Sequence, residues 1–246
     1  MSTDQIIIVM LGALSGGFVS GLSGFGTGLV AMGIWLHVVP PSIAASLVVI
    51  CSVVSQVQTI PTVWHAIQPK RVLPFIIPGL VGVPIGTQLL AYLDPNAFRF
   101  GMGLLLLCFS TVSLTCRTGL NIRWGGRIAD GSIGLAGGVL GGLAGLSGPI
   151  PTMWATIRGW GKDERRSVFQ AFNLSILLAA LLSHALSGYL TAEVGRALIA
   201  ALPGTLAGAW LGSRVYRRLS DRHFHNIILY LLGFSGLTLL WASWQG

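Results

Sequence analysis

Two copies of the tetrapeptide Gly-Leu-Ser-Gly carry the side chains with the clearest chemical potential in this chain. One copy occupies residues 21–24 and the other residues 145–148, so the copies lie 124 residues apart. A serine between glycines can act as a nucleophile beside a histidine. It can also donate hydrogen bonds, together with backbone N–H groups, to a bound anion. The surroundings of the two copies distinguish these chemistries.

Each copy lies deep in an apolar stretch and is followed by residues that interrupt a helix. Phe25, Gly26 and Thr27 follow the first copy, and Pro149 and Pro151 follow the second. Glycine in a helix interior costs backbone entropy, and serine offers the backbone a competing hydrogen bond. Each copy therefore predicts a place where a membrane helix is broken.

A helix that begins inside a membrane suits an anion. It presents unpaired backbone N–H groups and the positive end of its dipole. No Asp or Glu lies deep in any apolar segment, although a cation site would normally contain one. We expect a small anionic substrate, with no cofactor, metal or nucleic acid, and we expect Ser20 and Gly28 to serve packing. The substrate-binding candidates are Ser23, Gly24, Phe25, Gly26, Thr27, Ser46, Gln56, Ser147, Gly148, Pro149, Gln170 and Asn173.

The composition shows what must position these residues. Hydrophobic residues make up 53% of the 246 residues and charged residues only 9%, whereas soluble domains carry about 25% charged residues. The apolar runs reach the ~20 residues that a membrane-spanning helix needs. We therefore predict an all-α polytopic membrane protein. Its expected segments are 5–36 (broken), 42–65, 72–92, 97–116, 127–158 (broken), 167–189, 194–216 and 223–244.

The repeat extends beyond the tetrapeptide. Pro78-Gly79 matches Pro203-Gly204, and small residues at four-residue spacing follow both pairs, a pattern that lets helices approach closely in lipid. We infer an internal duplication, with one half at 1–120 and the other at 121–246. Each half would hold one broken, re-entrant segment and three transmembrane helices.

The basic residues predict how the halves are oriented. If both broken segments return to the side from which they enter, thirteen of the fifteen Lys and Arg residues face one side, and only Arg99 and Arg196 face the other. The positive-inside rule favours this arrangement. The halves are then inverted, both chain termini lie outside, and the architecture is that of many secondary transporters.

Residues 17–28, together with Ala44-Ala45-Ser46-Leu47, resemble the sulfite exporter TauE/SafE family of bacterial membrane transporters. That family shows a glycine-rich stretch, a proline and an Ala-Thr-Ser-Leu phrase. The resemblance implies export of sulfite, organosulfonates or related small sulfur-containing anions across the bacterial inner membrane. His65 and His184 match family histidines and are candidates for a proton relay, with a proton or another ion as the coupling partner.

Two other functions use the same residues. An anion channel could be built on the same scaffold. A rhomboid-like intramembrane protease could pair Ser23 or Ser147 with His184. Against the protease, the motif occurs twice, helix breakers follow both copies, and the charges favour inverted halves. We therefore expect no enzyme. The sequence does not indicate the oligomeric state.

Overall fold

The computed structural model describes residues 2–60, 69–115, 126–160, 162–216 and 221–245, and within these ranges it contains helices and no strand. The predicted all-α class is confirmed. The helices are α1 (Thr3–Ser23), α2 (Thr27–Trp35), α3 (Pro41–Thr59), α4 (Pro69–Tyr92), α5 (Pro95–Thr115), α6 (Gly126–Ala144), α7 (Pro149–Ile157), α8 (Lys162–Leu186), α9 (Ala192–Tyr216) and α10 (Asp221–Gln245).

Both predicted helix breaks are present, and glycine makes them. After α1 the chain turns through Gly24 and Gly26, whose φ angles are 80° and 105°. After α6 it turns through Gly145, with φ 67°. These left-handed conformations are costly for residues that have a Cβ atom. Pro149 then starts α7, where its fixed φ suits the first position of a helix.

Six helices in the described part of the chain are long and apolar enough to cross a membrane. They include α1, whose 21 residues span about 31 Å. The first broken segment is therefore a full-length helix followed by the short return helix α2. The protein is a polytopic membrane protein.

The closest helix pairs in the structure join the two halves of the sequence and run parallel. A methyl group added to Gly17 would meet Thr205, and one added to Gly21 would meet Ala209, so α1 and α9 run in the same direction. A methyl group added to Gly138 would meet Gly79, and one added to Gly142 would meet Val83, so α4 and α6 also run in the same direction. Glycine at these contacts lets two backbones touch, which is how helices bind each other in lipid.

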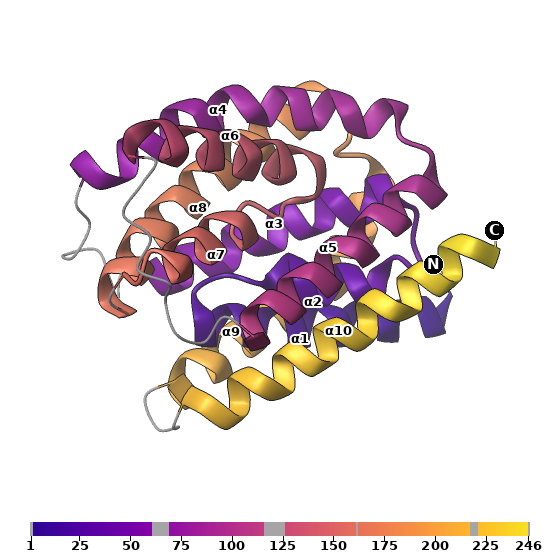
Figure 1. Ribbon diagram of the computed structural model, residues 1–246. Helices are drawn as coiled ribbons and strands as arrows, with labels where there is room; N and C mark the ends of the chain where they lie inside the picture. Colours follow the sequence, from indigo (N-terminus) through magenta and orange to yellow (C-terminus); the bar gives the residue numbers. More distant parts are fainter. Residues whose placement is uncertain (1, 61–68, 116–125, 161, 217–220, 246) are drawn as a thin grey trace.

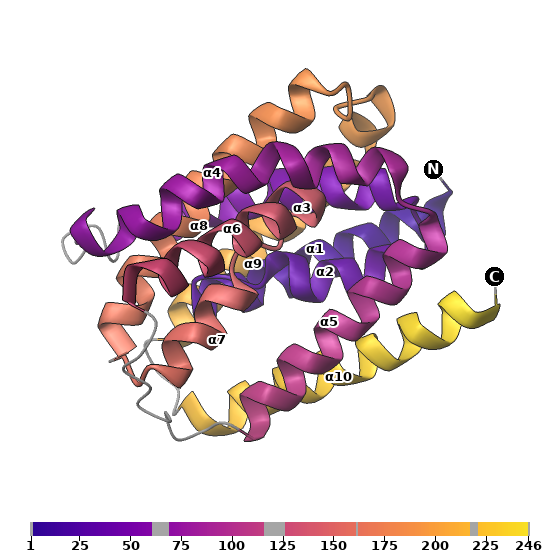
Figure 2. The same ribbon diagram turned by 45° about the horizontal axis from the view of Figure 1, so that its top comes forward.

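A third pair, α5 and α10, runs antiparallel (Figures 1 and 2). Gly103 faces Gly236, while the Ser110 hydroxyl donates to the Leu229 carbonyl over 2.5 Å. Both chain termini lie at the same end of the molecule (Figure 1). Inverted halves would give these directions. The inverted repeat stays a prediction, and its boundary at residue 120 lies outside the described residues.

A tryptophan fastens each short helix to the long helix before it. Trp35 Nε1 donates to the Val9 carbonyl over 3.0 Å. Trp154 Nε1 donates to Asp130 Oδ1 over 2.9 Å, and Arg158 pairs with the same carboxylate at 3.0 Å. The two nine-residue helices return toward opposite ends of the molecule. Each is about 13 Å long. Placed with their N-termini together, the two helices would cover about 27 Å, close to the ~30 Å of a hydrocarbon core.

The helix directions predict that both termini lie on one side of the membrane and the start of α6 on the other. Reporter tags at residue 2 and residue 245 should read as outside, and a tag inserted before Arg127 should read as cytoplasmic. Termini that both read as cytoplasmic would contradict the orientation. Termini on opposite sides would contradict the hairpins that α1 forms with α2 and α6 forms with α7.

The close pairs also predict which glycines tolerate a methyl group. Gly138→Ala places the methyl group against the Gly79 carbonyl, so it should lower stability by about 1–3 kcal/mol. Gly101→Ala is the control, because a methyl group there meets nothing within 4 Å. Thermal unfolding in detergent should show a lower midpoint for the first variant only. Equal midpoints would refute the close contact of α4 and α6.

Candidate functional site

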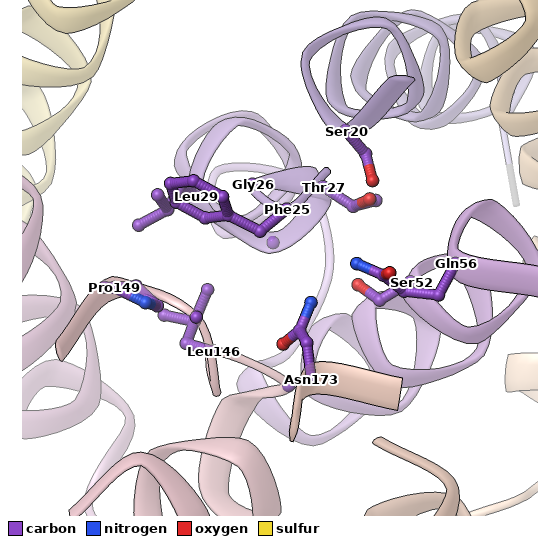
Figure 3. A pocket seen from close by; sticks show the side chains of 13 residues that line it. Ser20, Phe25, Gly26, Thr27, Leu29, Ser52, Gln56, Leu146, Pro149 and Asn173 are labelled. Carbon is purple, nitrogen blue, oxygen red and sulfur yellow. The ribbon is translucent and has the colours of Figure 1, made fainter. Parts of the chain in front are cut away.

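A small pocket lies where the two helix breaks meet, and α3 and α8 close its sides (Figure 3). It has room for about one water molecule. A larger ligand therefore requires the pocket to widen. The lining residues are Ser20, Phe25, Gly26, Thr27, Gly28, Leu29, Ser52, Gln56, Gly145, Leu146, Gly148, Pro149 and Asn173.

The N-terminus of α2 contributes backbone donors to the pocket. Gly26 precedes this helix without a side-chain cap, and the first backbone bond runs from Val30 N–H to the Gly26 carbonyl over 3.3 Å. The N–H groups of Thr27, Gly28 and Leu29 therefore have no partner within the helix. All three residues line the pocket. The positive end of the α2 dipole lies at the same place.

The N-terminus of α7 is poorer in donors. Two of its first three residues, Pro149 and Pro151, carry no N–H group, which leaves Ile150. The first backbone bond at this tip runs from Thr152 N–H to the Gly148 carbonyl over 3.1 Å. The two tips are therefore unequal, and α2 is the richer source of hydrogen bonds.

Two hydroxyl groups at the pocket have no hydrogen-bond partner. Ser20 Oγ and Thr27 Oγ1 are buried, each residue only 1% exposed. Figure 3 shows both oxygens near the Gln56 and Ser52 side chains. A buried hydroxyl without a partner costs about 1–3 kcal/mol, so a ligand that accepts from them would recover that energy. We expected Ser20 to serve packing, and the structure places it in the pocket lining.

Asn173 presents its amide nitrogen to the pocket. The Ser147 hydroxyl donates to Asn173 Oδ1, which fixes the amide so that Nδ2 is the group left to face the pocket. In Figure 3 this nitrogen points into the space between Leu146 and Gln56. Ser147 itself does not line the pocket, so its role is to hold Asn173.

Gln56 is fixed by the first helix break. Its Nε2 donates to the Gly24 carbonyl over 2.5 Å, and its Oε1 is buried without a partner. An end-for-end turn of the amide would set Oε1 against the Gly24 carbonyl, so the observed orientation is the favourable one. The pocket thus has several donors and one fixed acceptor.

The sequence comparisons identify the family of the chain. The sequence model of the family described as sulfite exporter TauE/SafE matches residues 8–239. The chain belongs to the sulfite exporter TauE/SafE family. No curated protein and no solved structure matches it. Family membership confirms the expected class of multi-pass membrane transporter.

Five of the twelve predicted binding residues of this TauE/SafE protein lie outside the pocket lining, namely Ser23, Gly24, Ser46, Ser147 and Gln170. Ser23 is exposed, and its hydroxyl donates to the Val19 carbonyl over 2.8 Å and to the Phe25 carbonyl. Gln170 Nε2 donates to Thr59 Oγ1 over 3.3 Å. Ser23 shapes the turn after α1, and Gln170 joins α8 to α3. Gly24 acts on the pocket indirectly, because its carbonyl accepts the hydrogen bond that orients the Gln56 amide.

Ser46 and His184 form a separate buried cluster. Ser46 Oγ lies 3.1 Å from His184 Nδ1, and His184 Nε2 donates to the Gly142 carbonyl over 2.7 Å. Both ring nitrogens are therefore engaged, in a contact that joins α3, α6 and α8. His184 bonds to neither Ser23 nor Ser147, so the described residues give no support to the protease. His65 lies outside the described residues, and the proton relay stays a prediction.

The buried, unpartnered hydroxyl of Thr27 predicts that the ligand-free protein is less stable than it would be without this hydroxyl. Thr27→Val replaces the buried hydroxyl by a methyl group of similar size, and it should raise the stability of the ligand-free protein by about 1 kcal/mol. The control is Thr87→Val. Thr87 Oγ1 donates to the Val83 carbonyl over 3.1 Å, so loss of this hydrogen bond should lower the stability of the protein. Thermal unfolding without ligand should show shifts of opposite sign. A lower unfolding midpoint for Thr27→Val would contradict the conclusion that the Thr27 hydroxyl has no hydrogen-bond partner.

Proposed function

We propose that the protein exports small sulfur-containing anions, sulfite or an organosulfonate, across the bacterial inner membrane. The observation that carries this proposal is the pocket at the helix breaks, where buried hydroxyl, amide and backbone donors converge without an acidic side chain. Donors held in place before the ligand arrives bind an oxyanion without reorganisation.

The pocket also suits a ligand with an apolar face. Phe25, Leu29 and Leu146 line one part of it, and the polar ends of Ser20 and Gln56 line another (Figure 3). Sulfite and sulfonates have three oxygens on one side of the sulfur. The other side carries a lone pair or a carbon chain, so both the polar and the apolar walls would be used. A fully hydrated cation would find no carboxylate here.

The orientation follows from the basic residues. Helix α6, whose second residue is Arg127, begins at the end of the molecule opposite the chain termini, and α7, which Arg158 follows, ends there (Figure 1). The turn between α4 and α5, which precedes Arg99, lies near the termini. The positive-inside rule makes the arginine-rich end cytoplasmic, so both termini would lie outside. Export would carry the anion from the arginine-rich end toward the termini.

The narrow pocket favours a carrier over a channel. A carrier exposes its site to one side at a time, and such a protein exchanges labelled for unlabelled substrate. Proteoliposomes loaded with unlabelled sulfite should therefore accumulate external labelled sulfite transiently. A channel shows no such counterflow, so its absence alongside sulfite flux would replace the carrier by a channel.

Asn173 provides the test of the pocket. Asn173→Leu keeps the side-chain shape but removes the amide donor, so sulfite binding should weaken about tenfold to a hundredfold. Binding of labelled sulfite to purified protein measures this directly. Ser147→Ala should give a smaller loss, because the amide remains but is no longer held.

The matched control is Ser175→Ala on the same helix. The Ser175 hydroxyl donates to the Ala171 carbonyl of its own helix over 2.9 Å and does not line the pocket. Its affinity for sulfite should equal that of the unchanged protein. Wild-type affinity in a folded Asn173→Leu variant would overturn the proposed site.

A further inference from the structure

The charge of the pocket limits the charge of its ligand. Among the residues that the structure describes, no Lys, Arg, His, Asp or Glu lines the pocket. The positive contribution comes from two helix N-termini, α2 and α7, each equivalent to about half an elementary charge. Together they supply at most about one positive charge. The prolines of α7 remove N–H groups that carry part of it.

A ligand with one negative charge therefore balances the pocket, and one with two charges does not. Near the middle of a membrane an uncompensated charge costs several kcal/mol. The pocket lies at the N-termini of α2 and α7, and each of these helices extends about 13 Å away from it. Water at the surface is too far away to screen a second charge.

Gln56 adds a second requirement. An anion with acceptor oxygens alone would leave Gln56 Oε1 buried without a partner. The amide cannot turn round without losing the 2.5 Å bond from Nε2 to the Gly24 carbonyl. A ligand that donates one hydrogen bond and accepts several would satisfy both Gln56 and the hydroxyls of Ser20 and Thr27.

We propose that the site selects the singly charged, protonated form of its oxyanion, with Gln56 Oε1 accepting the hydrogen bond from the ligand's hydroxyl. For sulfite this form is hydrogen sulfite. The inference rests on the proposed function, and it adds the protonation state of the substrate and the residue that recognises it. Each transported anion then carries one proton as part of itself.

The pH dependence would belong to the ligand. Among the described side chains of the surrounding helices, the buried titratable groups Asp130 and His184 bond to partners away from the pocket. Asp130 on α6 pairs with Arg158 at 3.0 Å, and His184 on α8 bonds to Ser46 and to the Gly142 carbonyl. Asp4 lies at the start of α1, and Cys51 on α3 does not line the pocket.

The test is equilibrium binding of labelled sulfite to the purified full-length protein at pH values on both sides of the second ionisation of sulfite. Above that ionisation, the apparent affinity for total sulfite should fall about tenfold per pH unit, because only the protonated fraction binds. Methanesulfonate is the control, since it carries one charge throughout. Its affinity should not change with pH and should be about tenfold weaker than that of hydrogen sulfite, because it cannot donate to Gln56.

Sulfate and Gln56→Leu complete the test. Sulfate, a dianion throughout, should bind at least about tenfold more weakly than hydrogen sulfite at every pH. Gln56→Leu should abolish the preference for hydrogen sulfite over methanesulfonate. A pH-independent or rising sulfite affinity, or sulfate binding as tight as hydrogen sulfite, would overturn the inference and leave sulfite transport standing. No binding of sulfite or methanesulfonate at any pH would overturn both.

Discussion

A helix that ends inside a membrane leaves backbone N–H and carbonyl groups that hydrocarbon cannot satisfy. The structure depends on meeting this constraint twice, once after α1 and once after α6. Each break is enclosed by other helices, and its polar groups receive protein partners. The Gly24 carbonyl accepts from Gln56, and the short helices are fastened at their far ends by Trp35 and Trp154. Ser20 Oγ, Thr27 Oγ1 and Gln56 Oε1 are buried without a partner in the described part of the chain, and all three residues line the pocket.

The two breaks are related by sequence but not equal in chemistry. The first leads into Thr27, Gly28 and Leu29, which all carry N–H groups. The second leads into two prolines. An anion at the junction would therefore be held mainly by α2. The opposite wall, from α6, α7 and α8, would contribute the Asn173 amide and apolar contact. If the two halves arose by duplication, as the sequence predicts, the two helix N-termini have since become unequal as hydrogen-bond donors.

The sequence predicts the helices and the breaks well, because glycine and proline act locally. It predicts the binding residues less well. Ser20 and Ser23 lie one turn apart on α1, and the pocket takes Ser20 while Ser23 turns to its own backbone. Which face of α1 points inward is set by its packing against α9, a contact between residues some 190 positions apart. Gln170 and Asn173 differ in the same way, because Thr59 on α3 captures the first of them.

The closest helix contacts have a consequence for movement. Backbones touch where α1 meets α9 and where α4 meets α6, and each of these pairs takes one helix from each half of the sequence. Separating the halves would open both contacts. A rearrangement that keeps them moves α1 with α9 as one body and α4 with α6 as another. Each of these two bodies would then combine one helix from each half of the sequence, so the bodies that move would differ from the two predicted repeats.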